Sequence, residues 1–283
     1  MDDSIARDLW TVLEPLHAVT YFEAECLEAN KEAGLKGFWM GYFGSRAAPM
    51  GAVPAGMVEA TFFGFHPSRV RRAVPDAWRF ASPERILGIR GAAAARALRR
   101  IVPGIERTAA EAAPVLHRAV EEAAAAGRPL FGANRDLDVP DDPVEALWQA
   151  ATALREHRGD GHVAVLTSEG LDGLTSNVLA AAVGAVTPDQ MLISRGWSRE
   201  QWDEAADALV ARGLVGGGTA TEAGRALKAR IEERTDALAA PPYHAVGDPK
   251  ALYDLLVPAA EAVADAGEMP YPNPIGLPRA GRA

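Results

Sequence analysis

Residues 196–227 constrain the fold of this chain more than any other segment. Ser198, followed by Gln201 three positions later, has the spacing of a capped helix start. Gly213 then ends that helix before the short apolar pair Leu214-Val215. A glycine-rich tip at 216–218 follows, and Thr221 is placed to begin another helix. The segment therefore predicts a helix, a short strand, a tight tip and a second helix, in that order.

This order resembles the winged helix-turn-helix of MarR-type regulators. The resemblance implies that a helix of this region enters the major groove of DNA, with Trp197 and Trp202 anchoring it to the core. Acidic side chains on that helix outnumber basic ones: Glu200, Asp203, Glu204 and Asp207 stand against Arg199 and Arg212. The tip at 216–221 has no Lys or Arg. Carboxylates beside phosphates oppose binding by ~1 kcal/mol or more each. We therefore expect a winged helix kept for packing or dimerisation, with nucleic acid not its partner.

Composition and charge point to a globular protein. The chain has 283 residues, 48% of them hydrophobic, which allows two domains or one large helical domain. A net charge of −9 works against nonspecific binding to nucleic acid. Cys26 is the only cysteine, so we expect a reducing, cytoplasmic location and a structural thiol. The acidic residues 1–4 predict no signal peptide, and no apolar run is long enough to predict a membrane span.

The apolar periodicity predicts a mainly α fold of several helices, with the winged module near the C-terminus. Pro15 interrupts the first helical pattern. A long helix is expected from Pro143 to Arg155, and another one after the glycines at 159 and 161.

The polar, proline-containing stretch 132–143 predicts a domain boundary. We expect an N-terminal helical domain at 1–135, a helical plus winged-helix domain at 143–245, and a helix with a Pro-rich tail at 246–283. Similar Gly-aromatic steps at 64–69 and 196–199 suggest a tandem repeat of two related helical halves. Two such halves would face each other across a ligand cleft.

The densest cluster of functional groups is residues 155–162. His157, Asp160 and His162, together with His17, are the candidate catalytic residues, because a histidine oriented by a carboxylate can transfer protons. Arg158 is a candidate for holding an anion. The structural alternative is a helix end followed by Asp160 capping the next helix.

An aromatic-rich set is the predicted pocket lining. With a neighbouring guanidinium it suits an apolar ligand with an acidic head, and the candidate ligand-binding residues are Tyr21, Trp39, Tyr42, Phe43, Arg46 and Phe63. Core packing is the alternative role for the rings. Arg46 has to find an anionic or polar partner if it is buried.

The sequence has no motif that predicts a bound metal or cofactor. Glu14 and His17 have the spacing of a carboxylate-bridged site only once, and no metal site is expected. No phosphate-binding loop is present, so the cofactor stays unassigned.

The whole chain also resembles an actinobacterial family of helix-turn-helix proteins. The resemblance rests on residues 16–22, 41–49, 155–162, 196–198 and 221–227 and covers most of residues 9–240. It implies a mostly helical fold and carries no activity with it.

Two hypotheses follow. The first is a small-molecule-binding protein, with catalysis left open, on a degenerate winged-helix scaffold that does not bind DNA. The second is a MarR-like, ligand-responsive transcriptional regulator that uses residues 174–240 as a homodimer. The salt dependence of binding to a short DNA duplex separates them.

Overall fold

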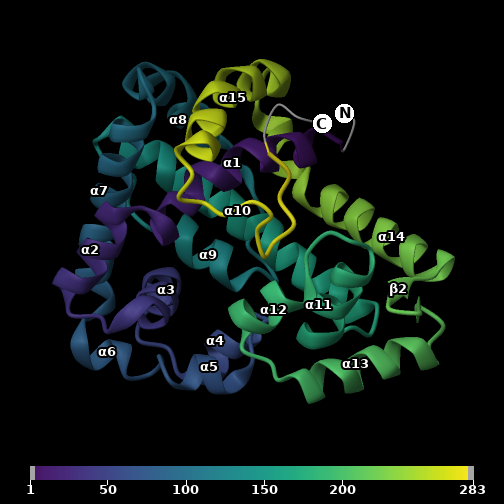
Figure 1. The fold of residues 1–283 in the computed structure, drawn as a ribbon. Helices are drawn as coiled ribbons and strands as arrows, with labels where there is room; N and C mark the ends of the chain where they lie inside the picture. Colours follow the sequence, from purple (N-terminus) through teal and green to yellow (C-terminus); the bar gives the residue numbers. More distant parts are fainter. Residues whose placement is uncertain (1–3, 280–283) are drawn as a thin grey trace.

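The computed structural model describes residues 4–279 as an assembly of helices with one small hairpin (Figure 1). The predicted mainly α fold is confirmed. Residues 1–3, on which the signal-peptide expectation partly rests, and residues 280–283 of the Pro-rich tail lie outside the described part. No helix among the described residues is long and apolar enough to cross a membrane.

The chain before residue 136 forms helices α1 to α9 and the 3-10 helix η1. Their bounds are α1 (Ser4–Phe22), α2 (Ala24–Ala33), α3 (Gly37–Ala47), η1 (Ala48–Met50), α4 (Ala55–Thr61), α5 (Pro67–Arg71), α6 (Ala77–Phe80), α7 (Pro83–Ile101), α8 (Ile105–Glu122) and α9 (Pro129–Arg135). α1 runs through Pro15, which the sequence marked as an interruption, and ends at Phe22.

The later part of the chain contains the longest helix and the hairpin. Its elements are α10 (Pro143–Ser168), α11 (Gly173–Ala182), α12 (Pro188–Arg195), α13 (Arg199–Ala211), β1 (Val215–Gly216), β2 (Thr219–Ala220), α14 (Glu222–Ala239), η2 (Pro241–Ala245) and α15 (Pro249–Ala266). β1 and β2 are antiparallel, with Val215 opposite Ala220.

Local capping explains where several of these helices begin. Ser198 and Gln201 form the predicted capping box at the start of α13. Thr221 accepts a hydrogen bond from the backbone N–H of Gly224 and begins α14 as predicted. Asp142 accepts from the N–H groups of Val144 and Glu145 at the start of α10. Each cap satisfies N–H groups that have no partner inside the helix.

α10 is the central helix of the molecule. It packs against α1, α7, α8, α9 and α14 (Figure 1). The largest apolar core surrounds its first half, and another core joins its last turns to α11–α14. The predicted division near residues 135–143 stays a prediction, as does the repeat of two halves.

The expected helix break at 159–161 is wrong. α10 continues through both glycines, with His157, Asp160 and Gly161 buried inside it. A Cβ atom at position 161 would lie 2.6 Å from Nη1 of Arg128 and 3.5 Å from Leu238 Cβ. The glycine therefore permits close packing of neighbouring segments and does not mark a turn.

The segment between α4 and α5 packs directly against α11. A Cβ atom at Gly173 would lie 2.0 Å from the carbonyl oxygen of Phe63, so only glycine fits there. Asn177 Nδ2 donates to the carbonyl oxygen of Gly64 at 3.0 Å. These contacts fix residues 63–64 beside α11, on the edge of the cleft described next.

Candidate functional site

A cleft of about 540 Å³ lies between the first helices and α11–α14. Its walls come from α1, α3, α10, α11, α12 and α14, from residues 61–65 and from the C-terminal segment at 274–278. Pockets for small organic ligands usually measure about 300–1,000 Å³. The cleft therefore has the volume of a small-molecule site.

Four of the predicted site residues line this cleft, namely Tyr42, Arg46, Phe63 and His162. The other predicted residues lie outside the cleft, and each of them packs against or hydrogen-bonds to another residue of the chain.

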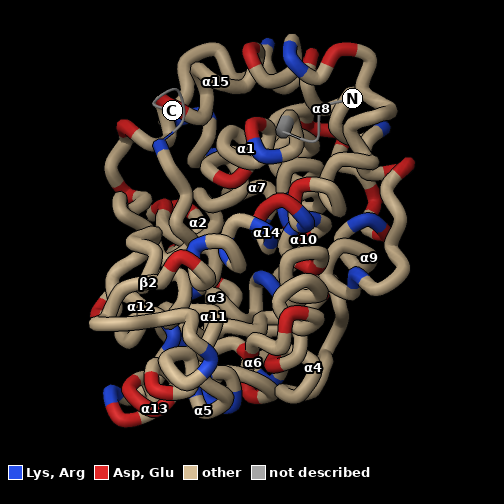
Figure 2. The backbone as a smooth tube through the Cα atoms, turned by 90° about the vertical axis from the view of Figure 1, so that its right-hand side faces the viewer, with Lys and Arg blue, Asp and Glu red and all other residues tan. Residues whose placement is uncertain are grey.

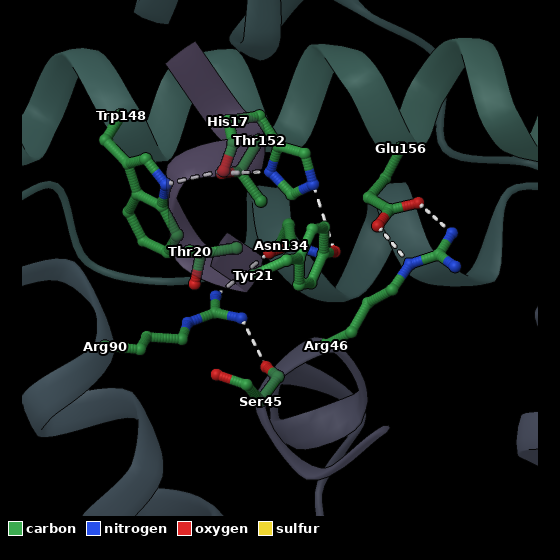
Figure 3. Close-up of a pocket in the computed structure, with 10 residues that line it drawn as sticks. All are labelled: His17, Thr20, Tyr21, Ser45, Arg46, Arg90, Asn134, Trp148, Thr152 and Glu156. Atoms are coloured by element: carbon green, nitrogen blue, oxygen red, sulfur yellow. Dashed lines mark hydrogen bonds and ion pairs between the residues drawn. The ribbon is translucent and has the colours of Figure 1, made fainter. Parts of the chain in front are cut away.

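A buried ion chain lies beside the cleft and consists of Glu14, Arg155, Glu156 and Arg46. Arg46 donates from Nε and Nη2 to the two Glu156 carboxylate oxygens at 2.7 and 2.9 Å (Figure 3). Arg155 donates from Nη1 to Glu156 at 2.9 Å and from Nε to Glu14 at 3.1 Å. Arg46 thus has the anionic partner that a buried arginine requires, and this partner is Glu156 of the same chain.

The ion chain stays charged because its members compensate one another. Burial opposes ionisation of Glu156, but Arg155 and Arg46 outweigh it and hold the pKa of this carboxyl below its usual value. Burial also opposes protonation of Arg46, and Glu156 more than reverses this and raises the pKa of Arg46. The cluster therefore has two positive and two negative charges out of water.

His17 and Tyr21 lie next to the ion chain in a small polar cluster. His17 Nδ1 is 3.0 Å from the Thr152 hydroxyl and Nε2 is 3.0 Å from the Tyr21 hydroxyl (Figure 3). Burial is the main cause that lowers the pKa of His17, so the ring is neutral. The cavity among these side chains measures about 10 Å³, which holds one water molecule at most.

Trp39 and Phe43 belong to an aromatic core and not to the cleft wall. Phe43 is fully buried, and its ring centroid lies 5.7 Å from that of Phe62. Trp39 packs on Phe43 and under the guanidinium of Arg69. The core-packing alternative accounts for the contacts of both rings.

His157 and Asp160 face α9. Asp160 Oδ2 accepts from the backbone N–H of Phe131 at 2.9 Å, and the His157 ring packs edge-on against Phe131. Burial lowers the pKa of His157 to about 3 and raises the pKa of Asp160 to about 6. Asp160 thus binds an N–H in the first turn of α9, rather than beginning a helix after residue 160.

Arg158 and His162 face α14. Arg158 Nη1 donates to Asp236 at 2.6 Å, which ties α10 to α14. His162 Nδ1 is 2.9 Å from the Thr235 hydroxyl. Burial is the main cause that lowers the pKa of His162 to about 4, so the ring facing the cleft is neutral at neutral pH.

Three arginines that line the cleft, Arg7, Arg155 and Arg195, are not among the predicted site residues. Arg155 belongs to a cluster that the sequence did single out, but its pairing with Glu14 joins helices far apart in the chain. Arg195 ends α12 directly before Gly196 and looks like an ordinary helix terminus in the sequence. No local pattern identifies either residue.

Metal ligation has no support from the arrangement of Glu14 and His17, because Glu14 pairs with Arg155 and His17 with two hydroxyls. Within residues 4–279, no group of three or more His, Cys, Asp or Glu side chains is arranged to hold a metal ion.

We predict that Glu156→Gln destabilises the protein by about 3–5 kcal/mol, because it leaves two buried guanidiniums without their shared carboxylate. Urea denaturation followed by circular dichroism measures the loss. The matched control is Glu106→Gln, which breaks an exposed pair with Arg99 and should cost less than about 1 kcal/mol. Equal, small losses in both variants would contradict a structural role for the ion chain.

We also predict that Asp160→Asn raises the free energy of unfolding, relative to the natural protein, by an amount that increases with pH. The pKa of Asp160 is about 6 in the folded state, above its unfolded value of about 3.8, so its stabilising contribution exists below pH 4 and is lost as pH rises through 6. The unfolding free energy of the variant, relative to the natural protein, should therefore increase by about 3 kcal/mol between pH 4 and pH 7. The asparagine keeps an acceptor for Phe131. The exposed Asp138→Asn should show no such trend, and a flat difference for Asp160→Asn would refute the prediction.

Comparison with known proteins gives the family of the chain but no characterised relative. No curated protein matches, and no solved structure matches. A family model described as a helix-turn-helix family matches residues 6–270, which is nearly the whole chain. The chain therefore belongs to this helix-turn-helix family.

Proposed function

We propose that this protein binds a small molecule in the cleft between α1, α3 and α10 on one side and α11, α12 and α14 on the other. The observation that carries the proposal is a cavity of about 540 Å³ whose walls combine apolar side chains with arginines, a histidine and other polar groups. Such a combination is typical of ligand sites.

The walls favour a flat apolar body. The apolar lining comes from several separate elements: Phe62, Phe63, Phe65, Leu166, Leu179, Val186 and Met191. Tyr42 adds an aromatic ring with a hydroxyl that accepts a hydrogen bond from Arg46 at 3.3 Å. An aromatic or polycyclic ligand would bury its faces against these side chains.

His162 is the residue that we propose as proton acceptor for any reaction in the cleft. It lines the cleft, is neutral, and has one ring nitrogen engaged by Thr235. His17, His157 and Asp160 are held by internal partners, which argues for positioning roles.

The proposal predicts saturable binding of N-phenyl-1-naphthylamine, a neutral dye whose fluorescence rises in apolar surroundings. Ala180→Trp places a large ring at the cleft wall on α11 and should weaken binding at least about tenfold. Fluorescence titration measures the dissociation constant of the dye for the natural protein and for the variant.

The matched control is Ala208→Trp, on the exposed face of α13, which should leave dye binding unchanged. Circular dichroism establishes that both variants are folded. Failure of the dye to bind, or equal binding in both variants, would remove the cleft from consideration as a ligand site.

We further infer that α11–α14 with the hairpin form a winged helix-turn-helix of the MarR type that does not bind DNA through α13. Glu200, Asp203, Glu204 and Asp207 are all exposed on α13, and Figure 2 shows acidic positions along this helix. The hairpin tip consists of Gly216, Gly217 and Gly218 without a cation. A helix presented to phosphates normally carries Arg, Lys, Asn or Gln instead.

The turn before α13 is also occupied by another part of the chain. The backbone N–H of His66 donates to the carbonyl oxygen of Arg195 at 2.9 Å, and the His66 ring packs against Trp197. Arg69 donates to the carbonyl oxygens of Ile193 and Ser194. The N-terminal end of α13, which usually approaches the bases, is thus flanked by α5.

Membership of a helix-turn-helix family favours the alternative function, a DNA-binding regulator. We expect no binding to a mixed-sequence duplex at about 20 mM salt, where nonspecific contacts are strongest. Neutralising α13 by Glu200→Gln, Asp203→Asn, Glu204→Gln and Asp207→Asn together should increase duplex affinity. Fluorescence anisotropy measures both proteins. Tight binding by the natural protein that falls steeply with salt would establish the regulator instead.

A further inference from the structure

Arg195 differs from the other cations of the cleft. It is the last residue of α12 and lines the cleft. Its Nη2 donates to the carbonyl oxygen of Pro274 at 3.0 Å, and its guanidinium lies over the Phe65 ring at 4.6 Å. Within residues 4–279, no carboxylate lies within 4.0 Å of it, and its enclosed Nε has no hydrogen-bond partner.

Every other cation of the cleft has a carboxylate partner. Arg46 and Arg155 share Glu156. Arg7 pairs with Asp236 at 2.6 Å, and Lys228 pairs with Glu232. Asp8, a further acid of the cleft, lies on the exposed side of α1. The positive charge of Arg195 is therefore not matched by a neighbouring anion.

The surroundings of Arg195 disfavour its charge. Burial is the main cause that lowers its pKa; Tyr42 acts in the opposite direction, and repulsion from Arg46 and Arg155 adds to the lowering. A guanidinium remains protonated under such conditions, because its pKa starts above 12. The site therefore retains a partly buried cation that lacks a carboxylate partner among the described residues, and such a cation gains from an incoming anion.

Contacts within the chain hold the backbone of Arg195 in place in the absence of a ligand. Its carbonyl oxygen accepts from His66, and Gly196 after it adopts a left-handed conformation with φ of 85°. Gly64 leaves the neighbouring wall open, since a Cβ atom there would lie 3.9 Å from Arg195 Nε and 3.4 Å from Asn177 Oδ1. A fixed donor loses little entropy on binding.

We propose that the ligand of the cleft carries one anionic group on an apolar body and that this anion pairs with Arg195. The inference rests on the proposed ligand-binding function and adds the ligand class. The anionic group is a carboxylate or a group of similar geometry, and the apolar body lies against the aromatic and aliphatic walls.

The test uses displacement of N-phenyl-1-naphthylamine by 1-naphthoate and by 1-naphthamide, which have nearly the same shape and differ in charge. We expect 1-naphthoate to bind the natural protein about tenfold or more tightly than the amide. Arg195→Gln removes the cation and should abolish this preference, with the affinity for the dye measured separately for each variant. Arg199→Gln, an identical change at an exposed position outside the cleft, should preserve it.

The outcomes separate the two proposals. If the dye does not bind at all, the ligand-binding function itself fails. If the dye binds but the two competitors displace it equally, or neither displaces it, the inference about Arg195 is overturned while the cleft stands. Should Arg195→Gln not fold, equal displacement by the two competitors on the natural protein still overturns the inference. Preference for the anion that persists in folded Arg195→Gln also overturns the assignment.

Discussion

The buried ion chain of Glu14, Arg155, Glu156 and Arg46 is the interaction on which the rest of the structure depends. It joins α1, α3 and α10, three helices that supply one wall of the cleft. Two carboxylates and two guanidiniums out of water are tolerable only when they face one another closely, since a buried charge without a partner costs several kcal/mol. A network of this kind contributes less to net stability than to specificity, because few arrangements of the helices satisfy all four groups. The position of α3 relative to α10 is fixed by that requirement.

The same requirement determines what the cleft offers to a ligand. Arg46 and Arg155 line the cleft, but their charges are already matched by Glu156 and Glu14. Their guanidiniums can orient a polar group, but an anion would have to compete with internal carboxylates. Arg195 has no such competitor among the described residues and also packs on Phe65. Arg46 and Arg155 thus join helices through their ion pairs, and Arg195 is the arginine that we propose for binding the ligand.

Local features of the structure could be predicted from the sequence, and long-range ones could not. Ser198 and Thr221 cap their helices as expected, because each cap depends on a residue only three positions away. The break expected at Gly159 and Gly161 is wrong: Gly161 instead lies against Arg128 and Leu238, which are distant in the chain and could not be paired with it from the sequence. Polar residues at 156–162 looked like a surface turn, yet they have partners on three neighbouring helices, α3, α9 and α14. Likewise, whether an arginine is paired or free depends on which acids the fold brings near it.

A helix-turn-helix family is defined by architecture, and architecture alone does not fix function. In this chain two independent features argue against DNA binding through the proposed winged helix of α12, α13 and the hairpin. The exposed face of α13 carries four carboxylates, and α5 occupies the side of the turn that precedes it. His66, directly before α5, also binds the carbonyl oxygen of Arg195, so the segment that flanks the turn before α13 positions the backbone of Arg195 as well. The turn between α12 and α13 is packed against residues 66–69 in this chain. We therefore assign ligand recognition to the side of α12 that faces the cleft, rather than DNA recognition to the exposed side of α13.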